Sequence, residues 1–213
     1  TEPIDVSRLE RALARAVSIE DLRRLARRRL PRLVFEFIDG GAEDELTLAE
    51  NRAAFERLRL VPRVLIDVSA PDLSAEILGR ASAAPFVIAP MGSCTLAWPG
   101  ADLALARAAA AHGIPFVLST MATIGIEELA QAVPGRLWFQ LYVLRHPEAN
   151  ASLVARADAA GYEALVVTVD LPAGGKRERD LRNGIAIPLR MRGRHLIEGA
   201  THPRWALGML RGG

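Results

Sequence analysis

The sequence predicts an α/β protein in which a mainly helical N-terminal segment precedes a parallel sheet covered by helices. Two observations support this prediction. Between residues 85 and 170, short apolar runs alternate with helix-like segments at a repeat of about 25 residues. These runs are continuous rather than interrupted at every second position, which is typical of strands buried on both faces of a parallel sheet.

The composition limits the classes of protein to which the chain can belong. Its 213 residues are 50% hydrophobic and 24% charged, which suits a globular domain with a sizeable core. The net charge is only +2, and no basic block is interleaved with aromatic residues, so nucleic-acid binding is not expected. The single cysteine, Cys94, fits a reducing compartment. Without a visible signal peptide or spanning segment, we expect a cytoplasmic location.

The N-terminal part shows helical patterns. Residues 7–37 repeat apolar side chains at helical spacing, and Ser18, with an acid three residues later, predicts the N-cap of a helix over about 20–29. Pro31 suits the first turn of a third helix. Residues 42–58 are amphipathic and highly charged, and predict a fourth helix. We expect these helices to cap a larger structure.

The alternating part follows. The predicted strands and helices are, in order, 85–90, 101–113, 115–120, 126–133, 137–143, 147–161 and 164–170. Four β/α units are about half of a TIM (β/α)8 barrel, which is the fold that we expect. An open doubly wound sheet is the competing architecture, but the first strand–helix turn, 90–100, lacks the Gly-x-Gly-x-x-Gly pattern of dinucleotide-binding sheets.

Three regions result from these patterns. Residues 1–84 are expected to form the helical segment and barrel cap, and 85–184 the first half of the barrel. Residues 185–213 lack a clear period, and we expect an irregular, mobile loop there.

The first predicted strand ends in Pro90, Met91 and Gly92, and the later strands end in polar residues. These polar residues are Ser119 and Thr120, then Gln140 and Tyr142, and finally Thr168 and Asp170. In parallel α/β folds the carboxyl ends of the strands carry the functional site. Any one of these residues could be an ordinary satisfied polar group, but together they predict a site. No metal site is expected.

Six segments carry a resemblance to a known family. They are LPRLVFEFIDGGAEDE (30–45), ENRAAFERLRLVPRVLIDVS (50–69), APMG (89–92), LSTMAT (118–123), WFQLYV (138–143) and TVDLPAGGKRERDLRNG (168–184). In this order and spacing the chain resembles the FMN-dependent enzymes that oxidise L-2-hydroxy acids. LWFQLYV, RERD-L-RN and HPRW (202–205) are most similar to the mandelate dehydrogenase branch.

The resemblance implies an FMN site. The backbone at 90–92 would approach the flavin ring, where a glycine permits a close contact. Hydroxyl and amide side chains would hydrogen-bond the nitrogen and oxygen atoms of the ring. These side chains are Ser119, Gln140 and Thr168.

The resemblance also implies a substrate site. Arg177 would bind the substrate carboxylate with its planar fork, although from the residues alone it could belong to a solvated charge cluster. Tyr142 would add a hydroxyl donor, and Asp170 would orient a catalytic histidine. Phe37 replaces a tyrosine that the family usually carries, and Met121 replaces a bulky aromatic residue. Both changes favour a mandelate-like substrate, while Phe37 could also be a core residue.

The implied reaction is oxidation of a mandelate-like or lactate-like 2-hydroxy acid to the 2-oxo acid, with hydride passing to flavin N5. Gly92 stands where oxidases of the family often carry alanine, so we expect a dehydrogenase that reduces a quinone. One alternative is an oxidase that makes hydrogen peroxide. An alternative of another class is a non-catalytic half-barrel that binds flavin or a partner chain.

Family members are longer, and their later half holds the base histidine, a lysine near the flavin and the phosphate-binding loops. None of the histidines here matches that base; they are His112, His146, His195 and His202. We therefore expect a C-terminal half of the same protein, or a second fragment, as a partner. Four explanations for the end at residue 213 are considered. The chain was cut in a mobile loop, the sequence has a gap there, the polypeptide is partial, or a separate second chain completes the barrel.

Two expectations concern larger assemblies. Basic and apolar residues interleave over 185–213, which favours peripheral contact with an anionic membrane surface on its inner face; an ordinary loop is the alternative. The family tends to form tetramers, so a homo-oligomer is expected.

Overall fold

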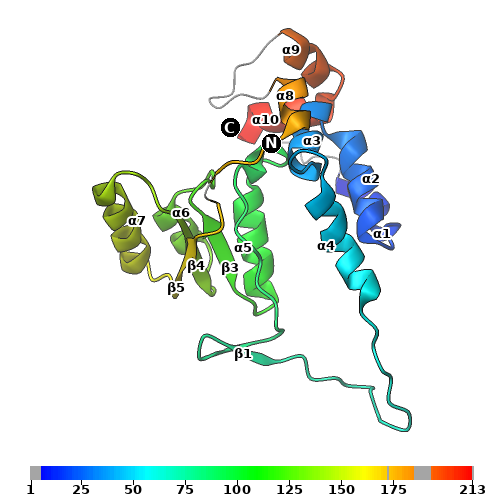
Figure 1. Ribbon diagram of the computed structural model, residues 1–213, viewed down its shortest axis with the longest axis vertical. Helices are drawn as coiled ribbons and strands as arrows, with labels where there is room; N and C mark the ends of the chain where they lie inside the picture. Colours follow the sequence, from blue (N-terminus) through cyan, green and yellow to red (C-terminus); the bar gives the residue numbers. More distant parts are fainter. Residues whose placement is uncertain (1–5, 172, 185–192, 213) are drawn as a thin grey trace. The chain divides into compact units, whose positions relative to one another are not determined.

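The computed structural model describes residues 6–171, 173–184 and 193–212. The chain divides into two compact units (Figure 1). The helical unit comprises Thr1–Ala54 and Gly175–Gly213, and the sheet unit comprises Phe55–Gly174. These boundaries differ from the predicted ones after residues 84 and 184, because the prediction was based on sequence motifs and the units are defined by packing.

The helical unit is built from short helices. They are α1 (Val6–Ala14), α2 (Ile19–Arg29), α3 (Arg32–Asp39), most of α4 (Leu46–Arg57), α8 (Glu178–Asn183), α9 (Gly193–Ala200) and α10 (Pro203–Gly212). The predicted cap of α2 is confirmed, because Asp21 N donates to Ser18 Oγ at 3.2 Å and Ser18 N donates to Asp21 Oδ2 at 3.1 Å. Helix α4 begins four residues later than predicted, since Glu43 and Glu45 adopt left-handed backbone angles that a helix cannot contain.

The prediction of an irregular C-terminal segment is wrong where the structure describes it. Helices α9 and α10 occupy most of 193–212, while 185–192 lie outside the described residues. The turn between them is held by the Thr201 hydroxyl, which donates to Glu198 O at 2.7 Å. Pro203 then begins α10, a position that suits its fixed φ. The two helices are too short to show a period in the sequence.

The sheet unit contains the predicted alternation. Its elements are β1 (Ala75–Ile77), β2 (Arg80–Ser82), a 3-10 turn η1 (Cys94–Leu96), α5 (Ala101–Ala111), β3 (Phe116–Ser119), α6 (Ile126–Ala132), β4 (Leu137–Tyr142), α7 (Pro147–Ala159) and β5 (Ala164–Thr168). Strands β3, β4 and β5 form a parallel sheet in that order. Strands β1 and β2 form an antiparallel hairpin that the sequence patterns did not predict; Leu78 and Gly79, both at positive φ, make its turn.

The first predicted strand, 85–90, is reduced to a single parallel bridge between Ile88 and Phe116. Ile88 N donates to Pro115 O and Val117 N donates to Ile88 O, both at 3.0 Å. The prolines at 85 and 90 lack an N–H group, which limits the ladder to the residues between them. The segment is also less buried than predicted, since Phe86 is 64% exposed.

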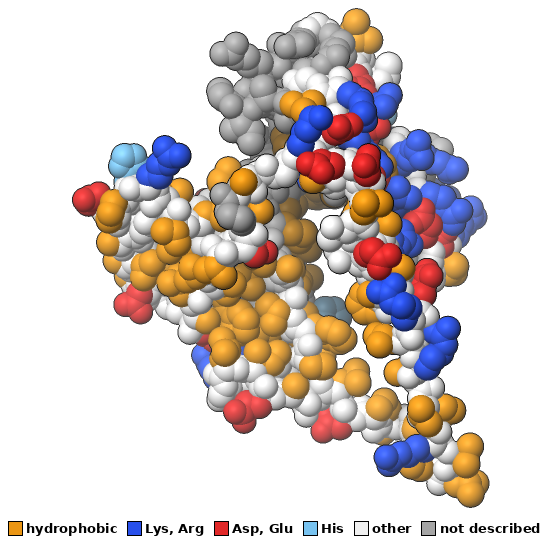
Figure 2. All heavy atoms as spheres, in the orientation of Figure 1, with side chains coloured by type: hydrophobic (Ala, Val, Ile, Leu, Met, Phe, Trp, Pro, Cys, Tyr) orange, Lys and Arg blue, Asp and Glu red, His pale blue; other side chains and the backbone are white. Residues whose placement is uncertain are grey.

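The core of the sheet unit lies between the sheet and helices α5, α6 and α7. Leu118 on β3, Phe139 on β4 and Leu129 on α6 are at most 2% exposed. Strand β5 is the open edge, because no strand pairs with its second side among the described residues. Leu165 and Val167 on β5 are each 43% exposed. Figure 2 shows hydrophobic side chains gathered over this unit.

A charge network holds the amino-terminal ends of the strands. Glu163, just before β5, pairs with Arg136 Nε at 2.8 Å and with Arg80 Nη1 at 2.5 Å. Arg136 also donates to Ile77 O at 3.0 Å and to Ala81 O at 3.1 Å. The network therefore fastens the β1–β2 hairpin to the starts of β4 and β5.

Candidate functional site

Three of the predicted site residues form a connected row at the carboxyl ends of neighbouring strands. Ser119 Oγ on β3 donates to Gln140 Oε1 on β4 at 3.1 Å. Gln140 Nε2 donates to Thr168 Oγ1 on β5 at 2.8 Å. Ser119 and Gln140 are buried, at 6% and 2% exposed. The parallel register places one polar residue per strand at the same edge of the sheet, as the sequence predicts.

Thr120, which was predicted to stand beside Ser119 at a strand end, fixes the orientation of the Gln140 amide. Thr120 N donates to Gln140 Oε1 at 3.1 Å, and the Thr120 hydroxyl donates to Gln140 O at 2.6 Å. Tyr142 N in turn donates to the Thr120 hydroxyl at 3.0 Å. Gln140 Oε1 therefore accepts two hydrogen bonds, and one hydrogen of Nε2 has no partner among the residues described.

Gly92 and Met121 lie against each other next to this row. A β-carbon added at Gly92 would fall 2.8 Å from Met121 Cβ, closer than carbon atoms pack. Met121 is held in place, because Ser93 N donates to Met121 O at 3.0 Å and Met121 N donates to Ser119 Oγ at 3.1 Å. Gly92 thus lies close to the neighbouring loop of the same unit that carries Met121, and its approach to the flavin ring stays a prediction.

Asp102 is a residue of this region that sequence reasoning missed. It is 3% exposed in the first turn of α5 and accepts hydrogen bonds from Thr123 N at 3.2 Å and from Thr123 Oγ1 at 2.9 Å. These bonds tie the loop that carries Met121 to α5. Burial, aided by the charge of Asp102, raises the pKa of the Cys94 thiol, which disfavours the reactive thiolate.

Two predicted residues of the sheet unit are less constrained. Tyr142 ends β4, pairs with Thr168 across the sheet and is half-buried. Asp170 lies two residues beyond the end of β5, which is shorter than the predicted 164–170, and is exposed. No described residue forms a hydrogen bond or an ion pair with its carboxylate.

The structure brings Arg177 and Phe37 together within the helical unit. Arg177 Nη2 donates to Phe37 O, and the guanidinium carbon lies 5.4 Å from the centre of the Phe37 ring. Arg177 Nε donates to Asp180 Oδ2 at 2.5 Å. Phe37, predicted to line the substrate site, therefore acts as a support for the arginine.

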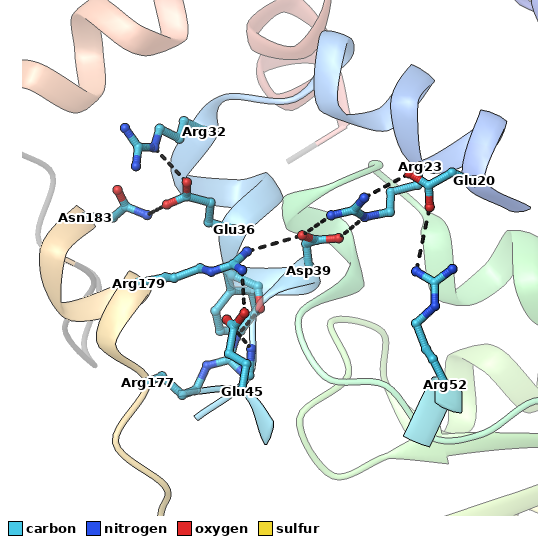
Figure 3. Close-up of polar contacts among 12 residues, drawn as sticks. Glu20, Arg23, Arg32, Glu36, Asp39, Glu45, Arg52, Arg177, Arg179 and Asn183 are labelled. Carbon is cyan, nitrogen blue, oxygen red and sulfur yellow. Dashed lines mark hydrogen bonds and ion pairs between the residues drawn. The ribbon is translucent and has the colours of Figure 1, made fainter. Parts of the chain in front are cut away.

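Two further residues of the RERDLRN segment, Arg179 and Asn183, bind α3 and the loop after it (Figure 3). Arg179 lies between Asp39, at 3.3 Å, and Glu45. Asn183 Nδ2 donates to Glu36 Oε2 at 2.6 Å. Arg179 and Asn183 thus hold α8 against α3, whereas Lys176 and Arg182 stay largely exposed.

Searches for two further kinds of site were negative. Within the described part of the chain, no helix is long and apolar enough to cross a membrane. The same residues contain no group of three or more histidine, cysteine, aspartate or glutamate side chains that could hold a metal ion.

Comparison with known proteins gives consistent matches. The sequence profile of a family described as FMN-dependent dehydrogenase matches residues 26–212. (S)-Mandelate dehydrogenase from Pseudomonas putida is 45% identical over 196 residues, which are 92% of this chain and 50% of the relative. A putative L-lactate dehydrogenase from Mycobacterium tuberculosis is 46% identical over 202 residues, which are 94% of this chain and 49% of the relative. The chain spans about half the length of these relatives.

The similarity extends to three dimensions. The crystal structure of the monotopic membrane protein (S)-mandelate dehydrogenase superimposes with a TM-score of 0.89 at 45% identity, over 93% of this chain and 53% of that chain. This likeness confirms the predicted fold class, because it identifies the parallel β/α units as part of a (β/α)8 barrel.

Proposed function

The chain belongs to the family of FMN-dependent dehydrogenases, and on this premise we propose that it forms the flavin-facing and carboxylate-binding part of an enzyme that oxidises an L-2-hydroxy acid to the 2-oxo acid. FMN is the cofactor of the family. When bound, FMN supplies the two-electron acceptor for the reaction. The names of the two relatives favour a mandelate-like or lactate-like substrate.

The row of Ser119, Gln140 and Thr168 is the observation that carries the proposal. Its hydroxyl and amide groups can both donate and accept, which fits the alternating donors and acceptors along the edge of an isoalloxazine ring. Ser119 and Gln140 are buried, Thr168 is half-buried, and the row is already ordered by its own hydrogen bonds, so little rearrangement is needed for binding. The backbone of Pro90, Met91 and Gly92 is proposed to approach the same ring.

Arg177 is proposed to bind the carboxylate of the substrate, and Tyr142 to donate its hydroxyl to the substrate. A guanidinium can bond both oxygens of a carboxylate, which aligns the carbon to be oxidised. Phe37 offers no hydroxyl, and Met121 is 52% exposed. The apolar character of each side chain favours the mandelate-like substrate.

The general base is proposed to be a histidine outside this chain, in a C-terminal half of the same protein or in a second fragment. His112 and His146 are exposed at the ends of α5 and α7, and His202 Nδ1 lies 2.9 Å from Glu198 O. The carboxylate of Asp170 is proposed to orient the missing histidine and to stabilise it when protonated.

The cofactor assignment can be tested at Gln140 in the complete protein. Gln140→Leu keeps the volume but removes every amide hydrogen bond of the row, so we expect FMN affinity to fall at least about tenfold. Quenching of FMN fluorescence on titration measures this affinity. Gln131→Leu, at an exposed glutamine on α6, is the matched control. Unchanged affinity in Gln140→Leu would remove the row from the FMN site.

The activity itself separates the alternatives. With FMN, the complete protein should show flavin absorbance bands that bleach on anaerobic addition of mandelate or lactate. Reoxidation by a quinone without hydrogen peroxide supports the dehydrogenase, and peroxide formation in air supports the oxidase. Flavin bands that never bleach favour the non-catalytic half-barrel. A protein that stays colourless and inert after FMN is added contradicts the proposal.

Peripheral membrane contact through 185–213 is proposed as well. The similar solved structure is described as a monotopic membrane protein, and the described part of this segment exposes Ile197, Leu207 and Leu210 beside Arg204 and Arg211. Flotation with anionic vesicles should carry the protein upward, and Leu207→Glu with Leu210→Glu should abolish this. Equal flotation of the variant would contradict the contact. We also propose that the complete protein forms a homo-oligomer and that it lies at the inner face of the membrane.

A further inference from the structure

Asp180 is a buried acid that the proposed reaction does not use. It lies in the first turn of α8 and is 8% exposed. Its Oδ2 atom accepts the Arg177 Nε hydrogen bond at 2.5 Å, whereas Oδ1 is buried with no hydrogen-bond partner among the described residues. Burying a carboxylate is costly unless a charge compensates it, so this acid depends on Arg177.

Arg177 depends on Asp180 in return. Of its five N–H hydrogens, the one on Nε is taken by Asp180 and one on Nη2 by Phe37 O. The Phe37 ring lies beneath the guanidinium carbon at 5.4 Å. The structure describes no partner for Nη1, and the arginine side chain is 37% exposed. The side of the guanidinium at Nε is thus closed, and the end at Nη1 is open.

The other acid of α8 does not share this role. Glu178 pairs with Lys176 at 3.1 Å and with Arg182, and both pairs lie on the exposed side of the helix. Asp180 is therefore the one acid of α8 that bonds Arg177 in the described part of the chain.

We propose that Asp180 is a positioning residue, which holds Nε of Arg177 so that the Nη1 end of the guanidinium meets the substrate carboxylate. This inference rests on the proposed role of Arg177. Without Asp180 the Arg177 side chain can rotate about its terminal bonds. The Nη1 end of its guanidinium then points toward the substrate carboxylate only part of the time. A carboxylate ligand then loses affinity, while a neutral ligand of the same shape does not.

The test uses the complete FMN-loaded protein and calorimetric titration with two ligands, the 2-oxo acid and its uncharged amide. Asp180→Ala should weaken binding of the acid about tenfold and that of the amide less than about twofold. Asp180→Asn keeps an oxygen that can accept from Nε, so it should recover part of the loss. Glu178→Gln, a change of the same kind on the same helix, should alter neither affinity.

A double-mutant comparison separates this inference from the proposed function. Arg177→Met should weaken acid binding strongly, and Asp180→Ala should add nothing in that background. If Arg177→Met leaves acid binding intact, the proposed role of Arg177 fails. If Arg177→Met weakens acid binding but both Asp180 variants bind acid normally, or lose acid and amide alike, the positioning role is overturned. Should Asp180→Ala fail to fold, Asp180→Asn decides by the same criterion.

Discussion

At the scale of single residues, Gly92 and Met121 restrict each other. The space for a β-carbon at Gly92 is taken by Met121 Cβ, an atom that cannot swing away because the backbone beside it is hydrogen-bonded at both its N–H and its C=O. A change at either position must therefore be judged together with the other.

This coupling gives a sharp prediction. Gly92→Ala should destabilise the protein by about 1–3 kcal/mol, because a β-carbon is forced into an occupied space. Adding Met121→Ala should not restore stability, since alanine retains the obstructing atom, whereas adding Met121→Gly should restore part of it. Urea unfolding of the four proteins measures this. Equal recovery with alanine and glycine at 121 would show that the obstruction lies elsewhere.

At the scale of elements, the contact between α8 and α3 depends on charges that act over long sequence distances. The Asp39 carboxylate accepts hydrogen bonds from Arg23 Nε at 2.5 Å and from Arg23 Nη2 at 2.9 Å. Arg179 on α8 forms an ion pair with the same carboxylate. The hydrogen bond from Arg23 is the main reason why the pKa of Asp39 lies below its ordinary value, and partial burial opposes the shift. One carboxylate therefore joins α2, α3 and α8.

The pH dependence of the helical unit should report on this carboxylate. Because the folded state lowers its pKa, Asp39 stabilises the fold at pH values above its ordinary 3.8, and this stabilisation is lost as the pH falls through the lowered value. Asp39→Asn should cost about 1 kcal/mol at pH 7, since water screens part of the attraction, and little at strongly acid pH.

Urea unfolding followed by circular dichroism between pH 7 and pH 2 provides the measurement. Asp44→Asn, at an exposed acid in the loop before α4, is the control and should change neither the stability nor its pH profile. A constant difference between wild type and Asp39→Asn at every pH would contradict the assigned role.

The elements also show which features a sequence can reveal. The cap at Ser18 and the strands β3, β4 and β5 depend on neighbouring residues or on continuous apolar runs, and they were predicted. Asp102 was not, because its role depends on Thr123, which is close only in the fold. The hidden helices α9 and α10 have too few turns to display a period. The motif match located Ser119, Gln140 and Thr168, but not the bonds that join them.

At the scale of the whole molecule, many large apolar side chains of the described residues are exposed. Leu60 and Val61, in the segment between α4 and β1 that forms no helix or strand, are at least 90% exposed, and Val169 after β5 is 86% exposed. Such surfaces and an unpaired strand edge invite association. Other parts of a longer protein would be suited to covering them.

Expressed by itself, the chain should therefore self-associate as its concentration rises. Val167→Lys on β5 should reduce this association, because a charge on an edge strand opposes pairing with another chain. Val68→Lys, at an equally apolar residue outside the sheet, should have the smaller effect. Sedimentation velocity across a concentration series measures both. A chain that remains monomeric throughout would contradict the prediction.

The Glu163 network at the amino-terminal ends of the strands has a consequence for how the protein can change. Its partners Arg80 and Arg136 hold the hairpin and sheet together at one end, while the row through Gln140 lies at the other. Substitutions in the loops at the carboxyl ends of the strands, next to Gln140, should therefore leave the contacts at the amino-terminal ends intact. A laboratory selection for altered substrate preference should accordingly leave Glu163 and its two arginines unchanged. Substitutions at these three residues should lower the yield of folded protein rather than alter the reaction.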